Sequence, residues 1–366
     1  AGSEAGDGNK NGQYNTGLGY QALLKNKNGN SNTAVGAQTL FKNSKSTENT
    51  AFGAFSLHDN EEGDGNTGLG VNTLFQNISG DNNTAVGTRA LQGNLSGSGN
   101  TAVGHFSLNT AQTASNNVAI GDWSLWEAKA SGNTAVGHNS LYHNGQGVHN
   151  SALGDSADVT SSALSNATAI GFYARVDQSN KVRIGNTSVT KIGGQVGWSI
   201  FSDGRFKKNI KEDVLGLSFI NSLRPVTYTV DTKSINNYLE RNNTKDKPAA
   251  ENTEIQKANE AASKIVYNGF IAQEVEALAK KLNYDFSGVD KPETTDGLYG
   301  LRYDNFVVPL VKAVQELSKI NDDKDAKIND LQKQIDELKA MVLGNKSTSK
   351  TATVNSAQLD QNIPNP

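Results

Sequence analysis

The sequence predicts a mainly β, fibrous protein in three parts: a parallel β-roll solenoid, a small α+β domain and a C-terminal coiled coil. Three observations support this prediction: a 17-residue repeat in the first half of the chain, a break in the repeat near residue 177, and a heptad pattern from residue 310. Only 35% of the 366 residues are hydrophobic and 37 are glycine, which argues against one conventional large core.

Composition excludes several classes of protein. A formal net charge of -3 offers no electrostatic footprint for nucleic acid or for an anionic membrane. The absence of cysteine excludes disulfides, zinc fingers and thiol chemistry. No stretch approaches the roughly 20 apolar residues of a membrane span, so we expect no membrane insertion.

The repeat occupies residues 1–176, and a glycine closes each unit. Ten pieces similar to Asn-Thr-Ala-Val-Gly end on glycines that are 17 residues apart in eight of nine intervals and 16 apart once. A fixed period of this kind predicts a solenoid with one coil per repeat. The glycines are Gly19, Gly36, Gly53, Gly70, Gly87, Gly104, Gly121, Gly137, Gly154 and Gly171.

Every coil carries the same pattern around its glycine. A large apolar residue precedes the glycine and Ala or Gly precedes that residue, so large and small side chains alternate along a short strand. A leucine follows four positions after the glycine in eight coils, whereas Asp158 and Arg175 replace it in the last two, as terminal coils are expected to differ. An asparagine four positions before the glycine can hydrogen-bond backbone or its own copies above and below.

A single roll of this composition has a thin core. About two large apolar side chains per coil bury too little surface to offset the ordering of 17 residues at about 1–2 kcal/mol each. Three rolls packed side by side would bury a second face. From about residue 15 to 175 the pattern resembles the head of YadA-type trimeric autotransporter adhesins, although the period here is longer than usual. That resemblance implies a left-handed roll, a homotrimer and an adhesin-like fibre.

Residues 177–201 break the period, and we expect a connector there. The segments that follow include "FSDGRFKKNI", "IKEDVLGLSFINSLRPVTYTV", "GFIAQEVE" and "YGLRYDNFVVPLVKAVQEL". These four segments resemble the endosialidase-type intramolecular chaperone, the self-cleaving C-terminal domain of phage tail spikes and fibres. The resemblance implies a chaperone and autoprotease domain at 202–309 that drives trimer assembly. An insertion at 231–268 departs from compact members of that family, and its composition predicts a disordered segment or a helical hairpin that decorates the surface.

The first of these segments contains the candidate chemistry. A serine is a useful nucleophile only with a base, and a lysine can be that base only where burial or nearby cations favour its neutral form. The resemblance implies that Ser202 is the nucleophile and Lys207 the general base, that Asp203, Arg205 and Lys208 support them, and that the Ser202–Asp203 bond is cut once. A serine followed by basic residues is more often a solvated turn. A domain that keeps the chaperone fold without cleavage therefore stays open.

The rest of the chain is predicted to be helical before a flexible tail. "GFIAQEVEALAKKL" predicts a helix with an apolar stripe. Residues 310–343 have a heptad seam in which Asn321 and Lys324 are polar positions that would fix register or bind an ion at the axis. The tail at 344–366 ends in residues that resemble the start of a type IX secretion sorting domain, which implies contact with secretion machinery. The matching positions are Leu359, Gln361, Asn362, Pro364, Asn365 and Pro366.

Two functions remain open at this point. The first is a secreted or bacterial cell-surface trimeric fibre that meets a surface glycan or protein receptor; the second is a phage tail fibre or spike on a virion with a releasable chaperone domain. The five histidines lack ligand spacing, so we expect no metal and no other cofactor. A glycan hydrolase is disfavoured because no pair of carboxylates recurs in the coils.

Overall fold

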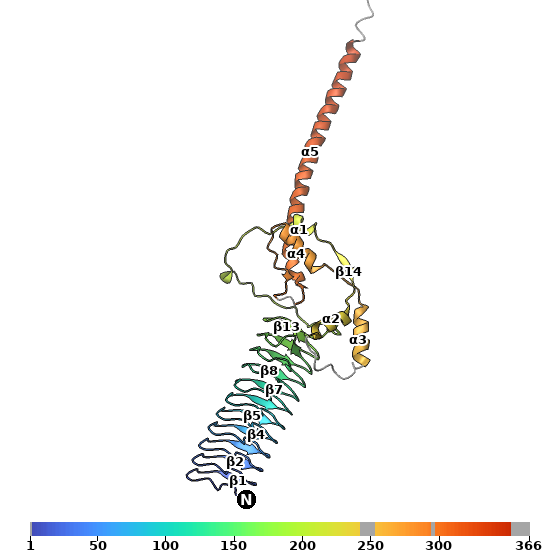
Figure 1. The fold of residues 1–366 in the computed structure, drawn as a ribbon. Coiled ribbons are helices and arrows are strands. Elements are labelled where there is room, and N and C mark those ends of the chain that lie inside the picture. The colour runs from blue at the N-terminus through green and yellow to red at the C-terminus, as the bar shows by residue number, and fades with distance from the viewer. Residues whose placement is uncertain (1, 242–252, 294–296, 353–366) are drawn as a thin grey trace, which may run out of the picture. The chain divides into compact units, whose positions relative to one another are not determined.

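The computed structural model describes residues 2–241, 253–293 and 297–352 (Figure 1). The chain forms two compact units. The roll unit comprises Ala1–Ser199, Thr227–Gly269 and Lys291–Leu298, and the helix unit comprises Ile200–Val226, Phe270–Asp290 and Tyr299–Pro366. Among the described residues, no helix combines the length and the apolar character that a membrane crossing needs.

The roll is a parallel solenoid with one short strand per coil, as the repeat predicts. Its sheet has eleven strands, and each strand pairs in parallel with the equivalent strand of the next coil, so that Thr16 lies opposite Thr33. The strands are β1 (Thr16–Leu18), β2 (Thr33–Val35), β3 (Thr50–Phe52), β4 (Thr67–Leu69), β5 (Thr84–Val86), β6 (Thr101–Val103), β7 (Val118–Ile120), β8 (Thr134–Val136), β9 (Ser151–Leu153), β11 (Thr168–Ile170) and β13 (Val182–Ile184).

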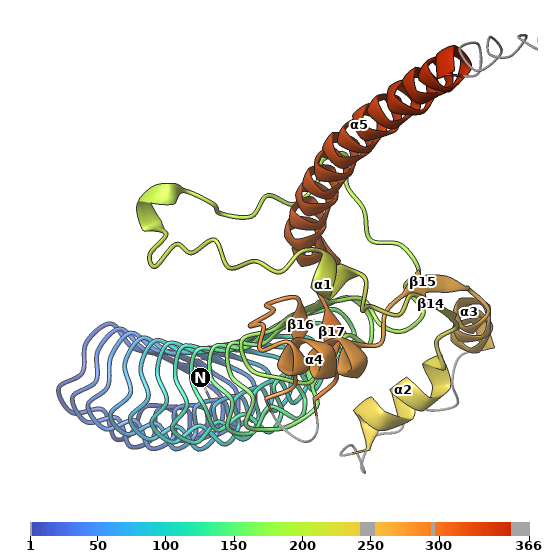
Figure 2. The ribbon, with the colours of Figure 1, turned by 90° about the horizontal axis from the view of Figure 1, so that it is seen from above.

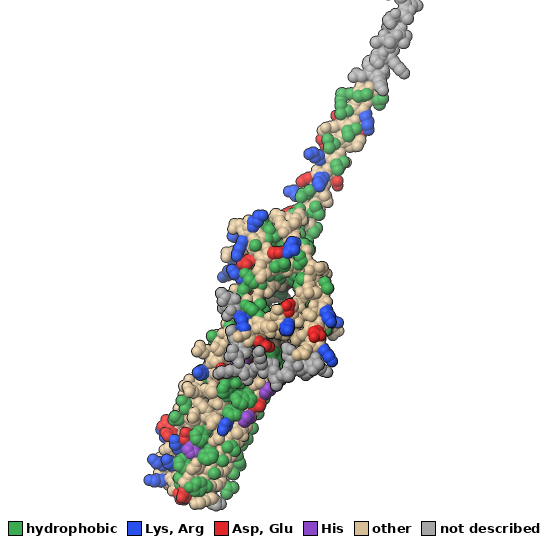
Figure 3. All heavy atoms as spheres, turned by 45° about the vertical axis from the view of Figure 1, so that its right-hand side comes forward, with side chains coloured by type: hydrophobic (Ala, Val, Ile, Leu, Met, Phe, Trp, Pro, Cys, Tyr) green, Lys and Arg blue, Asp and Glu red, His purple; other side chains and the backbone are tan. Residues whose placement is uncertain are grey.

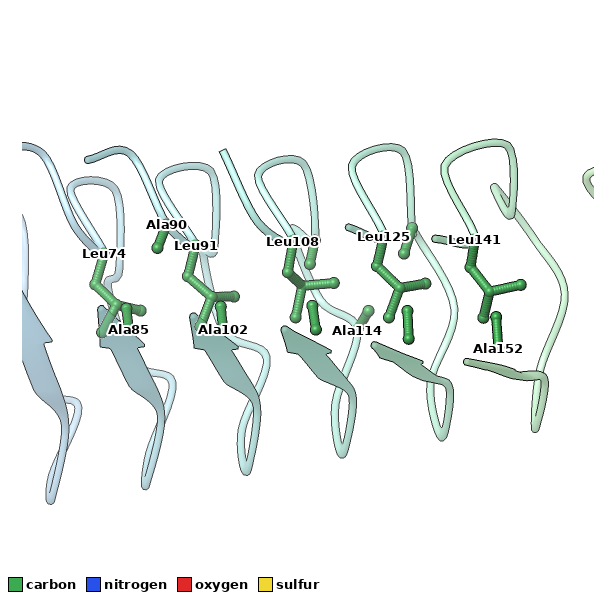
Figure 4. Packing of buried hydrophobic residues seen from close by; sticks show 14 of the residues in the cluster. Leu74, Ala85, Ala90, Leu91, Ala102, Leu108, Ala114, Leu125, Leu141 and Ala152 are labelled. Carbon is green, nitrogen blue, oxygen red and sulfur yellow. The ribbon is translucent and has the colours of Figure 1, made fainter. Parts of the chain in front are cut away.

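The interior of the roll is a ladder of leucines packed against alanines (Figure 4). The repeated leucines take a left-handed backbone conformation, with φ of 49° at Leu40 and 48° at Leu141. This conformation costs about 1–2 kcal/mol for a residue with a side chain, and burying a leucine contributes about 1.5–3 kcal/mol, so burial outweighs the cost. Gly36 has φ +136°, and a Cβ there would lie 2.7 Å from the backbone of Gly53. Both the conformation and the close stacking therefore require glycine at this corner.

The large residue before each glycine points outward, while the small residue before it points inward. Ala34 and Ala51 are fully buried, whereas Leu18 and Leu153 are 50% and 55% exposed. Only one large apolar side chain per coil therefore fills the interior. The outward residues form a row that we call the strand ridge, and its members are Leu18, Val35, Phe52, Leu69, Val86, Val103, Ile120, Val136, Leu153 and Ile170.

Two asparagine ladders connect the coils. The predicted ladder is present: the backbone N–H of Asn49 donates to Oδ1 of Asn32 at 3.0 Å, and its Nδ2 donates to the carbonyl of Gly63. A second ladder runs seven positions after the glycine in the first five coils, where Nδ2 of Asn43 donates to Oδ1 of Asn26 at 2.7 Å. Sequence analysis did not single out this second ladder. Its members hydrogen-bond one another between coils and also bond backbone carbonyls, so that these buried polar groups have partners.

A buried ion pair replaces the leucine ladder in the last two coils. There β10 (Asp158–Val159) pairs with β12 (Arg175–Val176), and Nη1 of Arg175 donates to Oδ2 of Asp158 at 2.9 Å. The side chains of Asp158 and Arg175 are 1% and 6% exposed. Nδ1 of His143 lies 2.7 Å from the same carboxylate oxygen. The last two coils thus stack like the others, but a buried ion pair takes the place of the leucine contact.

The described part of the insertion at 231–268 belongs to the roll unit. It forms α2 (Thr232–Glu240) and α3 (Thr253–Ser263), and β15 (Tyr267–Gly269) pairs with β14 (Val226–Tyr228). Oγ1 of Thr187 donates to Oδ1 of Asn236 at 2.7 Å, and Oγ of Ser188 donates to Oδ1 of Asn259 at 2.8 Å. The helical alternative of the prediction is therefore the observed one. These helices contact the end of the roll through polar groups rather than only decorating a surface.

The helix unit has a small aromatic core. Phe219 from α1 (Leu217–Ile220) is fully buried, and it packs with Val275 of α4 (Ala272–Lys281) and with Phe306 of the 3-10 turn η2 (Tyr303–Phe306). The predicted helix after residue 269 is thus confirmed as α4, with the apolar stripe facing this core. The strands β16 (Val289–Asp290) and β17 (Gly300–Leu301) pair antiparallel beside it.

A long helix, α5 (Val307–Ala352), follows the core and covers the predicted heptad segment. Its apolar side chains lie along the surface of the helix (Figure 3). Seam positions are well exposed in the single chain, for example Val314 at 60% and Ile335 at 46%. The predicted helix over residues 310–343 is therefore confirmed. The apolar side chains of its seam are exposed to solvent in the single chain.

Candidate functional site

The predicted dyad lies on a loop of the helix unit, from Ile200 to Lys211, that we call the dyad loop. A short 3-10 turn, η1 (Gly204–Phe206), forms its tip. Asp203 caps this turn because its side chain accepts a hydrogen bond from the backbone N–H of Arg205 at 2.9 Å. In both ribbon views the tip, drawn yellow-green, extends away from α1 and α4 (Figures 1 and 2).

The turn brings Ser202 and Lys207 together. Nζ of Lys207 donates to Oγ of Ser202 at 2.8 Å, across five positions of sequence. A nucleophile and its base must lie within about 2.6–3.2 Å, so the pair has the separation that proton transfer needs. For catalysis the direction of this hydrogen bond must reverse, so that the hydroxyl of Ser202 donates to the amine. The geometry is compatible with the predicted roles, which remain predictions.

Two of the predicted supporting residues, Asp203 and Arg205, contact each other. Asp203 and Arg205 form an ion pair with Nη2 to Oδ2 at 2.6 Å. The side-chain hydrogen bond from Arg205, reinforced by its backbone N–H, lowers the pKa of Asp203 below its ordinary value. Arg205 therefore directs its charge at Asp203. Lys208 is exposed beside Lys207, and it is the cation that follows the base directly in sequence.

Solvent surrounds this site in the single chain. Four large apolar side chains on the loop are exposed, namely Ile200 at 72%, Phe201 at 77%, Phe206 at 67% and Ile210 at 77%. The ring centroids of Phe201 and Phe206 lie 5.6 Å apart, and each of these residues directly precedes one member of the dyad. Water favours a charged lysine, so the dry surroundings that the chemistry needs are missing from this arrangement.

A comparison with protein families gives one match in this region. Residues 202–284 match the family described as "Chaperone of endosialidase". The matched segment starts at Ser202, and it covers less than a quarter of the 366-residue chain, so it characterises this segment alone. A comparison with curated proteins gave no match. The predicted sorting motif at Leu359–Pro366 lies outside the described residues.

Sequence analysis missed a second unusual region, on the roll at coils six to eight. Phe106 and Trp123 stack at 4.5 Å, and Trp126 and Tyr142 stack at 5.3 Å. Trp126 Nε1 is buried and has no hydrogen-bond partner among the described residues. We call these four residues the aromatic cluster. Its signal was present in the sequence, because aromatic residues recur two and five positions after the glycine.

The histidines do not assemble into a metal site in the described part of the chain. No group of three or more histidine and carboxylate side chains comes together there in a way that could hold a metal ion. His105 instead contacts Asp122 of the next coil at 3.2 Å, and His138 contacts Asp155 at 3.1 Å. These exposed pairs link successive coils along one corner of the roll.

Proposed function

We propose that the protein is a homotrimeric fibre, secreted or held at a bacterial cell surface, whose chaperone segment aligns three chains during assembly. The strand ridge carries this proposal. It offers large apolar side chains along ten coils, and neither the ridge nor the residues two positions before it include a charged side chain. Exposed apolar surface of this length is typical of an interface between chains.

The open seam of α5 supports the same proposal. Isoleucine, valine and leucine alternate along it with spacings of three and four, so α5 gains an apolar partner only by pairing with other helices. This seam is compatible with dimers as well. Three chains are favoured by the family match at 202–284 and by the resemblance of the repeats to trimeric heads.

Light scattering on the full chain at micromolar concentration tests the oligomeric state. We expect the mass of three chains of 38.9 kDa. A stable monomer would contradict the proposal, because the ridge and the seam would then be left in water.

We further propose that Ser202 and Lys207 cut the chain once after assembly. Neutral Lys207 accepts the hydroxyl proton of Ser202, and the serine oxygen attacks the carbonyl carbon of the Ser202–Asp203 bond, which belongs to the same residue. The bond from this carbon to the Asp203 nitrogen breaks as a four-membered lactone forms, and lysine gives the proton to the leaving nitrogen. Water then opens the lactone to the Ser202 carboxylate and a free serine hydroxyl. The 2.8 Å contact between the two side chains supports this step.

The aromatic cluster favours adhesion as the role of the roll. Tyr and Trp side chains are enriched where proteins recognise partners. The cluster also lies where the roll departs from its own repeat: coil seven has 16 residues, and the second asparagine ladder is interrupted by Ala111 and Ala128. A surface glycan or protein receptor is the proposed ligand.

A phage tail fibre with a releasable chaperone is the alternative. Mass measurement of the mature secreted protein separates the two functions. A chain that keeps residues beyond 203 and loses only its tail fits the surface fibre. Complete loss of residues 203–366 fits the tail fibre.

A further inference from the structure

The helix unit contains a small apolar pocket that its own chain leaves open. The pocket has a volume of about 110 Å³ and lies between residues 222–224 and the first turns of α4. Leu223, Phe270, Ile271, Val275 and Leu278 form its apolar wall. A closed apolar cavity of about 150 Å³ holds a whole benzene molecule. This pocket is smaller but open to solvent, so it can take the outer part of one aromatic ring while the rest of the ring lies at its mouth.

Charge marks the rim of the pocket. Arg224 and Glu274 form a hydrogen-bonded ion pair there, with Nε to Oε2 at 3.0 Å. The side-chain hydrogen bond from Arg224 lowers the pKa of Glu274 below its ordinary value, so this carboxylate is charged at neutral pH. The rim therefore carries one positive and one negative group, and the Glu274 carboxylate has further lone pairs that can accept a hydrogen bond from an arriving basic side chain.

The dyad loop has the complementary composition. Phe206 lies at the end of η1, between Arg205 and Lys207, and Lys208 follows. Its ring is 67% exposed and contacts only neighbouring loop residues such as Phe201 and Arg205 among the ring contacts of the described chain. Docking in an apolar pocket would remove this exposed ring from water, which is favourable for an aromatic side chain.

We propose that the pocket binds Phe206 from the dyad loop of a neighbouring copy of this chain. The inference rests on the proposed oligomer. A neighbouring copy is the chosen donor because the tip of the loop extends away from α1 and α4 of its own chain in both ribbon views (Figures 1 and 2). Charge complementarity between Lys208 and Glu274 orients the docked loop.

Docking explains how assembly can activate the dyad. Ser202 and Lys207 lie within five positions of Phe206, and insertion of its ring brings both close to the pocket, where they lose part of their contact with water. Loss of water favours the neutral form of a lysine, which is the form that accepts a proton. The cleavage reaction therefore requires the neighbouring chain, and an unassembled chain stays intact.

The absence of cysteine from the chain allows a clean crosslinking test. Two forms of the full chain, both with Ser202→Ala to prevent cleavage, would carry Arg205→Cys and Ile271→Cys respectively, so that Phe206 is kept. They would be co-expressed and oxidised. We expect a disulfide-linked pair of chains on a non-reducing denaturing gel, because docking of the adjacent Phe206 ring would bring residue 205 close to residue 271, and a disulfide needs a Cβ separation of roughly 4 Å.

Matched variants make the outcome decisive. Lys281→Cys is exposed on the same helix outside the pocket, and in place of Ile271→Cys it should give at least tenfold less crosslink. A trimer by light scattering without the 205–271 crosslink, or equal crosslinking to residue 281, would overturn the docking and leave the oligomer standing. A chain that carries both cysteines and closes only an internal disulfide would also overturn it. A monomer would instead count against the proposed function.

Discussion

Asn94 shows what the second asparagine ladder contributes at the scale of one residue. Its Nδ2 donates to Asn77 Oδ1 at 2.6 Å and to the carbonyl of Gly97 at 2.9 Å. Its own Oδ1 is buried and lacks a hydrogen-bond partner in the described part of the chain, because Ala111 stands where the next asparagine would donate. A buried polar atom without a partner costs about 1–3 kcal/mol.

Restoring the ladder should therefore stabilise the roll. We expect Ala111→Asn to raise the free energy of unfolding by about 1 kcal/mol, since its amide would donate to Asn94. Urea unfolding followed by circular dichroism measures this change. Asn77→Ala is the matched control and should lower stability by about 1–3 kcal/mol, because it removes one rung and leaves a neighbour unpaired. An Ala111→Asn protein less stable than the original would count against the ladder.

The dyad makes a chemical prediction at the same scale. Ser202→Ala removes the nucleophile and Lys207→Ala removes the base, so each variant should give an intact chain that still assembles. Lys208→Ala should only slow the cut, because this residue affects the base without replacing it. Denaturing gels read all three results, and fragments from Ser202→Ala would refute the mechanism.

At the scale of elements, sequence predicted the strands and helices better than the surfaces they present. The 17-residue period predicted one strand per coil, and the apolar stripe predicted α4. Alternation of large and small residues could not tell which face is inside, because a two-residue period fits both. The interior is filled instead by leucines such as Leu40, which have a left-handed backbone conformation and are buried. A backbone φ of this kind cannot be predicted from the sequence pattern.

Polar contacts explain the other limits of sequence analysis. The insertion meets the end of the roll through Thr187, Asn236 and Asn259, none of which enters a hydrophobic pattern. Ser202 and Lys207 were paired through a family resemblance, since a spacing of five residues alone does not predict contact. The capped turn at Asp203 supplies that contact, and a single chain gives no signal for the apolar surroundings that the dyad needs.

The end coils offer a prediction about charge inside a repeat. Asp158→Leu restores the leucine of the other coils and removes the carboxylate that Arg175 and His143 contact. We expect a loss of about 3 kcal/mol, because a buried cation keeps its desolvation cost without its partner. The double variant Asp158→Leu with Arg175→Leu should recover that loss, since apolar replacement of a whole buried pair is often neutral or stabilising.

Chemical unfolding of the two single variants and the double variant forms a double-mutant cycle for this pair. The signature of the ion pair is a double variant more stable than either single variant. Additive losses would show that Asp158 and Arg175 act independently, and the buried pair would then have no role in joining the last two coils.

At the scale of the molecule, a roll of near-identical coils has a registration problem. Neighbouring rolls that slip by one 17-residue coil keep almost every ridge contact, because the ridge residue is large and apolar in all ten coils. In the proposed trimer, contacts between rolls would therefore hold the chains together without fixing their alignment. Alignment needs a segment that does not repeat, and both the family-matched segment and α5 meet this requirement.

Deletion of residues 202–343 should consequently leave rolls that associate without a single register. We expect the remaining roll to aggregate on refolding, since slipped rolls expose apolar ridge and the sheet ends at β1 and β13 offer strands for further pairing. Size-exclusion chromatography after dilution from denaturant measures the yield of soluble trimer, with the full-length Ser202→Ala chain as control because it keeps every segment and cannot be cut. A fragment of residues 1–201 that refolds to a soluble trimer as readily as this control would show that the ridge sets its own register, and the chaperone role of the C-terminal segment would be wrong.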